Sequence, residues 1–244
     1  MIHSTAIISP KAKIGNNVSV GAFSIINDNV VLGDNTIVES YCELGVINGL
    51  SGNEPLIIGK NSHIRSHSIF YAASVFGEKL ITGHRVTVRE KTFAGENLQI
   101  GTLSDIQGHC EIGDYVRFHS NVHIGQKSKI GNYVWIFPYV VLTNDPHPPS
   151  DTLIGVTVKD YAVIATMSVV LPGAVIERGV LVGAHSSIKG ITEQDMVYAG
   201  NPAKKICETA RIKLTNDPEK SAYPWRKHFS RGYPKNIVSE WFQE

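Results

Sequence analysis

An aliphatic residue recurs at every sixth position from Ile2 to Ile188, and this spacing limits the possible folds more than any other feature. The series runs from residue 2 to 44, resumes at 58 and runs to 142, and resumes again at 158. Every position in it is apolar except Thr82, although only 42% of the chain is hydrophobic. A period of six is neither the two of a strand nor the 3.6 of a helix, so it indicates a repeat architecture.

Each six-residue unit has the same internal pattern. Glycine often follows the aliphatic residue, as at Gly59 and Gly113, and a small or β-branched residue such as Ser62 or Val116 lies two places before the next aliphatic. Residues two apart in a strand point the same way, so each unit predicts a short strand with two inward side chains and then a turn. Three units close a triangular coil. The sequence therefore predicts an all-β fold, a parallel β-helix of about ten coils spaced roughly 4.8 Å apart.

Two interruptions of the period predict loops that leave the column at a corner. The extra residues lie within residues 46–55 (VINGLSGNEP) and residues 144–152 (NDPHPPSDT). Loops held by a rigid scaffold commonly carry function, although an insertion that the fold merely tolerates gives the same pattern.

The end of the repeat predicts a division of the chain. Residues 1–190 are expected to form the β-helix, and residues 191–244 a C-terminal helix and tail. Residues 203–215 (AKKICETARIKLT) read as a short helix, and residues 216–244 are rich in aromatic residues and proline. An open column end exposes backbone edges, so we expect this tail to cap its own column or to pack on a neighbouring one.

Composition excludes several classes of protein. The 244 residues carry a formal charge of +1, which gives no footprint of a nucleic-acid binder. The chain has no apolar run long enough to span a membrane and no apolar core of a signal peptide, so a cytoplasmic protein is expected. Cys42 and Cys110 occupy the small inward place of the repeat, and Cys207 lies in the expected helix. Their spacing suggests neither a metal site nor a disulfide framework.

Parts of the sequence resemble hexapeptide-repeat acyltransferases. The opening IHSTAIISPKAKIGNNVSVGAFSII is similar to the start of the UDP-N-acetylglucosamine acyltransferases of lipid A synthesis. The stretches IRSHSIFYAASVFGEKLITGHRVTVRE, LTNDPHPP and YAGNPAKKI resemble acetyltransferases that modify nucleotide-linked amino sugars, or sugars, for surface polysaccharides such as O-antigen. The resemblance covers roughly residues 1–206 and implies a left-handed coil.

The resemblance also implies a donor, an acceptor and an assembly. It implies an acetyl-CoA-dependent N-acetyltransferase that acts on a nucleotide-linked amino sugar, is a homotrimer and needs no metal. Acetyl-CoA would lie along the groove between two columns. The residues that would contact it are Ala165, Gly183, Ala184, Asn201, Pro202, Lys204 and Lys205.

Three histidines are candidates for the catalytic base. Counting about four coils back from the expected cofactor end brings the thioester near His119 and His123, with His147 of the second loop above them. Histidine suits the role because its pKa lies near neutrality. His147 resembles the His-Pro of related sugar O-acetyltransferases. His109 resembles the family's His-Asp-Cys box but is one place out of register. A free amine acceptor would need no protein base at all.

Other polar residues are expected to hold the acceptor. By the coil count His84 and Glu90 lie too far toward the N-terminus to reach the thioester. The full set expected to bind the sugar or its nucleotide is Arg65, His84, Arg89, Glu90, Asn144 and Asp145.

Four other functions remain open. The chain could be a sugar O-acetyltransferase, or an acyltransferase that uses acyl carrier protein, although near-neutral charge disfavours an acidic partner. A zinc site of the γ-carbonic-anhydrase type would need three histidines to converge, whereas His84, His119 and His123 fall at different phases of the repeat. A non-catalytic scaffold is the fourth possibility, and it gives no reason for a proline-braced histidine in the second loop.

Overall fold

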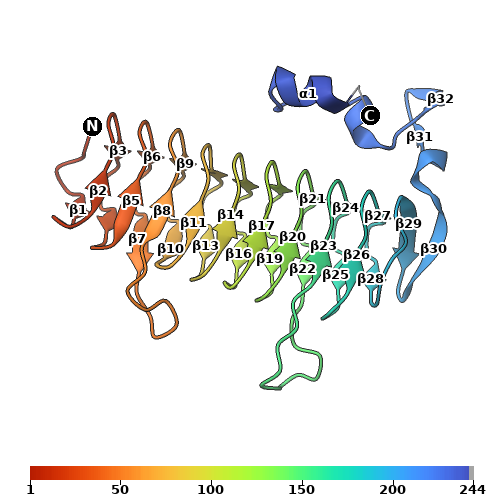
Figure 1. Ribbon diagram of the computed structural model, residues 1–244, viewed down its shortest axis with the longest axis horizontal. Helices are drawn as coiled ribbons and strands as arrows, with labels where there is room; N and C mark the ends of the chain where they lie inside the picture. The colour runs from red at the N-terminus through yellow and green to blue at the C-terminus, as the bar shows by residue number, and fades with distance from the viewer. Residues whose placement is uncertain (242–244) are drawn as a thin grey trace.

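The computed structural model describes residues 1–241, and most of them form one long three-sided column (Figure 1). Each side is a parallel sheet. Sheet 1 has the order β1 (Ile7–Ile8), β4 (Ile25–Ile26), β7 (Glu43–Val46), β10 (Ile69–Tyr71), β13 (Thr87–Val88), β16 (Asp105–Ile106), β19 (His123–Ile124), β22 (Val141–Leu142), β25 (Val169–Val170) and β28 (Ser187–Ile188). Sheet 2 has the order β2 (Lys13–Ile14), β5 (Val30–Leu32), β8 (Leu56–Ile58), β11 (Val75–Phe76), β14 (Phe93–Ala94), β17 (Glu111–Ile112), β20 (Lys129–Ile130), β23 (Thr157–Val158) and β26 (Val175–Ile176).

Sheet 3 differs from the other two at its last edge. Its parallel part has the order β3 (Ser19–Val20), β6 (Ile37–Val38), β9 (His63–Ile64), β12 (Ile81–Thr82), β15 (Gln99–Ile100), β18 (Arg117–Phe118), β21 (Trp135–Ile136), β24 (Val163–Ile164), β27 (Leu181–Val182) and β29 (Met196–Gly200). The strand β30 (Ala203–Glu208) then pairs antiparallel with β29. The three stacked sheets confirm the predicted all-β parallel β-helix.

The six-residue period sets the register of the coils. Ile8 pairs with Ile26 and Ile106 with Ile124, so one coil takes three units and each aliphatic residue stacks on the next. These side chains fill the core along the column axis. The polar exception, Thr82, is also buried, and its hydroxyl accepts the backbone N–H of Arg65 at 2.9 Å. A hydroxyl is tolerated at this inward position because it has a hydrogen-bond partner.

Tight corners explain the other places in the repeat. Residues such as Asn61, Tyr133 and His185 turn the corner with φ of 58°, 58° and 55°. This left-handed backbone is uncommon outside glycine and asparagine, and the coil geometry imposes it on many residue types. Glycine after the aliphatic residue has a different cause. A Cβ at Gly59 would lie 2.5 Å from the backbone of Gly77 in the next coil.

Both loops leave the column at the corner between sheets 1 and 2. The first joins β7 to β8, and the second joins β22 to β23, which places residues 47–55 and 144–152 outside the coils, while Val46 still belongs to β7. In Figure 1 the two loops project from the same side of the column. The polar face of sheet 1 therefore lies between two loops that are not part of the repeat.

The helix predicted over residues 203–215 is wrong. That stretch forms strand β30, the 3-10 turn η1 (Thr209–Arg211) and strand β31 (Lys213–Leu214), which pairs with β32 (Asp217–Ser221). The open edge of β29 offers a full set of backbone partners to residues 203–208, and tertiary pairing overrides a weak local helix propensity. A short helix forms later, α1 (Lys235–Trp241), after the 3-10 turn η2 (Trp225–Lys227).

The aromatic tail packs on the side of its own column rather than over the column end. From β32 it doubles back along the column (Figure 1). Its buried Trp225, Tyr233 and Trp241 pack on a corner ladder of stacked tyrosines that includes Tyr115 and Tyr133. Aromatic residues that cover one flank in this way bury apolar area that the column would otherwise expose. The expected tail runs to residue 244, and its last three residues lie outside the described part of the chain.

Three further expectations concern membranes and cysteines. Within residues 1–241 no helix is both long and apolar enough to cross a bilayer. Cys42 and Cys110 are buried free thiols, and burial raises the pKa of each to about 11, so neither provides a thiolate at neutral pH. Cys207 lies on strand β30 instead of the expected helix.

Candidate active site

An ion pair between Asp105 and His123 marks the outer face of sheet 1. The two residues are direct partners on the neighbouring strands β16 and β19, each just before an inward isoleucine, so both side chains point outward. Nδ1 of His123 lies 3.1 Å from Oδ2 of Asp105. The amide of Gln107 donates to the same carboxylate oxygen. A carboxylate that accepts the Nδ1 proton leaves Nε2 of the ring as the proton acceptor.

Asp105 remains charged in this setting. Burial raises the pKa of its carboxyl, but the hydrogen bonds from His123 and Gln107 and the nearby charges of His123 and Arg89 outweigh burial, so this pKa lies below its ordinary value. A charged Asp105 holds the imidazole of His123 in one orientation by accepting its Nδ1 proton. The pair therefore has the parts of an oriented general base, with a ring that is 40% exposed and open to a ligand.

A second polar group lies at the adjoining corner, under the first loop. The carboxylate of Glu90 is fully buried and accepts hydrogen bonds from Arg89 Nη2 at 3.1 Å and from Asn48 Nδ2 at 2.9 Å. Burial raises the pKa of Glu90, but these hydrogen bonds and the charge of Arg89 leave it lowered overall. Arg89 also lies over the ring of Tyr71 at 5.7 Å. Asn48 thus ties the first loop to the coil that precedes Asp105.

His109 lies at this same corner and does not serve as a substitute for His123. Burial and the charge of Lys91 lower the pKa of His109. Its neighbour Gly108 has φ of 88°, and a Cβ there would lie 2.5 Å from the carbonyl oxygen of Glu90. The one-place shift of His109 relative to the family's His-Asp-Cys box thus coincides with a corner whose close contact requires glycine at position 108.

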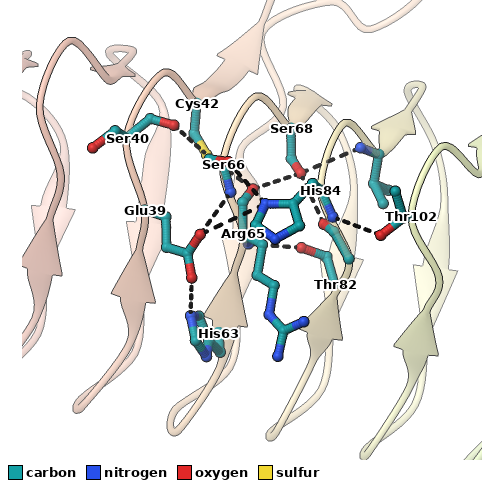
Figure 2. Close-up of polar contacts among 12 residues, drawn as sticks. Glu39, Ser40, Cys42, His63, Arg65, Ser66, Ser68, Thr82, His84 and Thr102 are labelled. Atoms are coloured by element: carbon teal, nitrogen blue, oxygen red, sulfur yellow. Dashed lines mark hydrogen bonds and ion pairs between the residues drawn. The ribbon is translucent and has the colours of Figure 1, made fainter.

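A third polar group follows the opposite corner, between sheets 3 and 1, nearer the N-terminus (Figure 2). Glu39 accepts from His63 Nε2 at 2.9 Å and from the backbone N–H of Ser66 at 3.1 Å, and His84 Nδ1 lies 3.8 Å away. Ser66 Oγ lies 2.8 Å from the same ring nitrogen of His84. The serine and the carboxylate thus share one nitrogen, which is not the arrangement of a Ser-His-Glu triad. The exposed side chain of Arg65 extends beside them (Figure 2).

The structure separates the three candidate bases. His119 stacks on Phe137 at 4.5 Å on the sheet 3 side of the coil, and burial lowers its pKa. His147 is exposed on the second loop. Its backbone N–H donates to Asp145 Oδ1 at 3.0 Å, while the hydroxyl of Ser150 donates to the same oxygen at 2.7 Å. Asp145 therefore braces its own loop, and among the three histidines only His123 has a ring nitrogen paired with a carboxylate in the described residues.

The residues expected to contact coenzyme A lie toward the C-terminal end of the column. Ala165 and Gly183 follow β24 and β27 on successive coils. Asn201 and Pro202 form the turn between β29 and β30. The remaining members of the set are the exposed residues Ala184, Lys204 and Lys205. Lys205 is paired with Glu193 at 2.8 Å, so its ammonium already has a partner.

No group of three or more histidine, cysteine, aspartate or glutamate side chains is placed to hold an ion in residues 1–241. His84, His119 and His123 lie on a corner, at the edge of sheet 3 and in sheet 1 respectively, as their different phases in the repeat predict.

Sequence reasoning missed Asp105, Gln107 and Asn48. The signal for the first was present, because Asp105 and His123 occupy the same place in units exactly three repeats apart and must therefore be neighbours on one face. Asn48 could not be found in this way because its loop lies outside the period.

Comparisons with known proteins agree with the fold. The family model described as the GMPPB C-terminal domain matches residues 1–96. The solved Arabidopsis UDP-N-acetylglucosamine acyltransferase superposes with a TM-score of 0.70 at 20% identity, covering 85% of this chain and 74% of that one. The corresponding enzyme of Bacteroides fragilis gives a TM-score of 0.52 at 16% identity, covering 100% of this chain and 82% of that one.

Curated relatives share more sequence but only part of their length. Two are named acyl-[acyl-carrier-protein]–UDP-N-acetylglucosamine O-acyltransferase. The one from Saccharophagus degradans is 35% identical over 138 residues, covering 54% of this chain and 48% of the relative. The one from Thermodesulfovibrio yellowstonii is 32% identical over 133 residues, covering 54% of this chain and 49% of the relative. The chain thus spans about half the length of these relatives.

These relatives correct the expected donor. Their names specify an acyl group carried by acyl carrier protein, which contradicts acetyl-CoA as the donor. Ala165, Gly183, Ala184, Asn201, Pro202, Lys204 and Lys205 were assigned through that donor, so the reason for their assignment falls with it. The opening residues resembled the carrier-dependent group from the start, and the stretches farther along the chain pointed to the wrong thioester.

Fold and sequence similarity lead to the same group of proteins. The coil repeat, the superposition on a solved acyltransferase and the identity to curated acyltransferases agree with one another. The chain shares the fold of a solved UDP-N-acetylglucosamine acyltransferase and is similar in sequence to curated acyltransferases over about half of their length.

Proposed function

We propose that this protein transfers an acyl group from the thioester of acyl carrier protein to a hydroxyl of a nucleotide-linked amino sugar. The observation that carries the proposal is the Asp105–His123 pair, an oriented base on the outer face of a column whose curated relatives are named for this reaction. Those names favour ester formation over the N-acetylation first expected. A hydroxyl acceptor, unlike a free amine, needs a base at neutral pH, and His123 meets that need.

The chemistry follows from the orientation of the ring. Nε2 of His123 accepts the proton of the sugar hydroxyl while that oxygen attacks the thioester carbonyl and forms the new C–O bond. Asp105 stabilises the imidazolium that results. The tetrahedral intermediate then breaks its C–S bond, and His123 returns the proton to the departing sulfur. The base is thus regenerated in each turnover.

The surrounding polar groups are suited to an acceptor with several hydroxyls and phosphates. Arg89, placed by Glu90 and Tyr71, presents a cation on the corner beside the pair. Arg65 and His84 present further exposed donors on the opposite corner. Guanidinium groups suit phosphate because they donate in a planar fork. Asn144 and Asp145 remain proposed acceptor contacts of the second loop, with Asp145 acting through the loop it braces.

The proposal also includes a homotrimer. One corner of the column carries a row of side chains in which Phe23, Tyr41, Leu103 and Tyr139 are apolar, each between 51% and 54% exposed, and Arg85 and Asn121 are polar. Exposed apolar rows of this kind mark protein contacts more often than free surface. Threefold closure of straight columns would cover them with a second copy.

A donor and acceptor screen tests the proposal. Acyl carrier protein loaded with chains of different length is incubated with a panel of nucleotide-linked amino sugars, and release of free thiol is followed. We expect turnover with at least one pair and a product that hydroxylamine cleaves, as an ester requires. Absence of transfer from every carrier-bound chain, or a product that resists hydroxylamine as an amide does, contradicts the proposal.

A further inference from the structure

An apolar pocket lies between sheet 3 and the C-terminal tail, away from the polar face of sheet 1. It has a volume of about 180 Å³. Its walls from the column are Trp135, Phe137 and Val163, and its walls from the tail are Tyr223, Trp225, His228 and Phe229. The repeat needs none of the tail residues, and the proposed chemistry uses none of these side chains.

Three polar atoms of the walls are already hydrogen-bonded outside the pocket. Trp135 Nε1 donates to the hydroxyl of Tyr233 at 3.0 Å, and Trp225 Nε1 donates to the carbonyl of Tyr161 at 3.3 Å. His228 Nε2 lies 2.7 Å from the carbonyl oxygen of Ala222. Besides the hydroxyl of Tyr223, the indole and phenyl faces make up most of the surface that remains for a ligand. A ligand with hydrogen-bonding groups would lose water there without gaining partners.

The aromatic walls hold one another in fixed orientation. Trp135 meets Phe229 edge-on at 5.6 Å and Trp225 edge-on at 6.1 Å. Perpendicular contacts of this kind are favourable pair geometries and resist collapse of the space between the rings. The pocket is therefore built by packing between distant parts of the chain.

The pocket lies close to the proposed base along the chain. Phe137, one of its walls, stacks on His119 at 4.5 Å. His119 and His123 flank one corner of the same coil, with only residues 120–122 between them. A linear ligand whose reactive end lies at His123 therefore reaches the pocket by passing around the corner between sheets 1 and 3 and along the column by one coil.

We propose that this pocket receives the distal end of the acyl chain of the donor, an inference that rests on the acyltransferase function proposed above. Of the parts of the two substrates, only the acyl chain is free of hydrogen-bonding groups. Sugar, nucleotide and carrier protein all bring polar atoms that these walls cannot satisfy. The tail thereby selects the length of the transferred chain.

Tryptophan fluorescence tests occupancy without turnover. The chain has three tryptophans, and Trp135 and Trp225 line the pocket. Decanoyl pantetheine carrying a terminal bromine is titrated into the protein, with unbrominated decanoyl pantetheine as the reference. We expect saturable quenching by the brominated chain alone, and affinity that rises about fourfold for each added methylene until the pocket is full.

Two variants locate the effect. Val163→Phe fills the pocket from the column wall, and Val75→Phe makes the same change at an outward position of sheet 2. Val163→Phe should weaken binding of the brominated chain at least tenfold, and it should lower kcat/KM for decanoyl carrier protein far more than for butanoyl carrier protein. Val75→Phe should change neither. Phe229→Leu, which widens the pocket from the tail, serves as the second variant if Val163→Phe fails to fold.

The outcomes separate this proposal from the proposed function. Transfer from acyl carrier protein without quenching, or equal quenching in Val163→Phe and Val75→Phe, overturns the pocket assignment and leaves the acyltransferase standing. Saturable quenching that Val163→Phe abolishes supports the pocket as an acyl-chain site even where no transfer is found. The absence of transfer would contradict the proposed reaction and not the pocket assignment.

Discussion

At the scale of single residues, two carboxylates with opposite exposure organise the candidate site. Asp105 is partly exposed and orients His123, whereas Glu90 is buried and holds Arg89 and Asn48 in place. The repeat could have predicted the first of these, because residues three units apart are forced side by side on one face. It could not predict the second, because Asn48 comes from a loop whose path no periodicity describes.

The buried carboxylate makes a prediction about stability and pH. Glu90 has a lowered pKa in the folded state, so its charge stabilises the fold above its ordinary pKa of about 4.5, and this contribution is lost as pH falls through the folded value. Glu90→Gln should cost on the order of 2 kcal/mol of unfolding free energy at pH 7, because Arg89 loses its ion-pair partner. The cost should shrink on acidification from pH 7 toward pH 3, as the wild-type carboxyl takes up a proton.

Urea unfolding at the two pH values measures this difference. Glu111→Gln is the matched control, since Glu111 forms an exposed ion pair with Lys129 at 3.0 Å and should contribute little at either pH. An equal cost for Glu90→Gln at pH 7 and pH 3 would show that its charge is not what stabilises the corner.

At the scale of elements, the six-residue period predicted the positions of the strands. After residue 190, where the repeat ends, packing against the column determines which elements form. Most strands of the coils end on the periodic apolar residue because that side chain must face the core, and β7 and β10 run one or two residues further. The helix expected over residues 203–215 failed because the edge of β29 provides a better partner than solvent. The aromatic residues of the tail signalled burial correctly but carried no information on which surface they cover. That surface is set by the corner tyrosines, which come from three separate coils.

The first loop yields a prediction at this scale. The amide of Asn48 ties it to buried Glu90, so Asn48→Ala should release the loop and leave Oε2 of Glu90 with Arg89 Nε as its remaining donor. We expect limited proteolysis within residues 46–55 to become roughly tenfold faster, since opening costs less free energy. Asn53→Ala, an exposed residue of the same loop, should leave the cleavage rate unchanged. Equal rates in the two variants would mean that another contact holds the loop.

At the scale of the whole molecule, a rigid column provides one polar face for chemistry and one aromatic flank for an apolar chain. The polar face of sheet 1 lies between two loops, and the flank on sheet 3 is closed by the tail. The same coil brings both close to His119 and His123. A column of this kind positions groups by register, so the spacing along the sequence translates directly into spacing along the site.

The proposed assembly is tested at this scale by mass in solution. The exposed apolar corner predicts a species of three times the chain mass of 26.7 kDa in sedimentation equilibrium. Tyr139→Glu places a charge in that row and should shift the distribution toward the single chain. A wild-type protein that sediments at 26.7 kDa would contradict the trimer while leaving the fold intact.

The central claim is that His123, oriented by Asp105, activates the hydroxyl of the acceptor. The most direct measurement is kcat for acyl transfer from acyl carrier protein by His123→Ala, with His147→Ala and His119→Ala measured beside it and the fold of each checked by circular dichroism. The account predicts a fall of about 10²- to 10⁴-fold for His123→Ala and a change of less than about tenfold for the other two. Full activity in His123→Ala, or its loss in His147→Ala instead, would contradict the account.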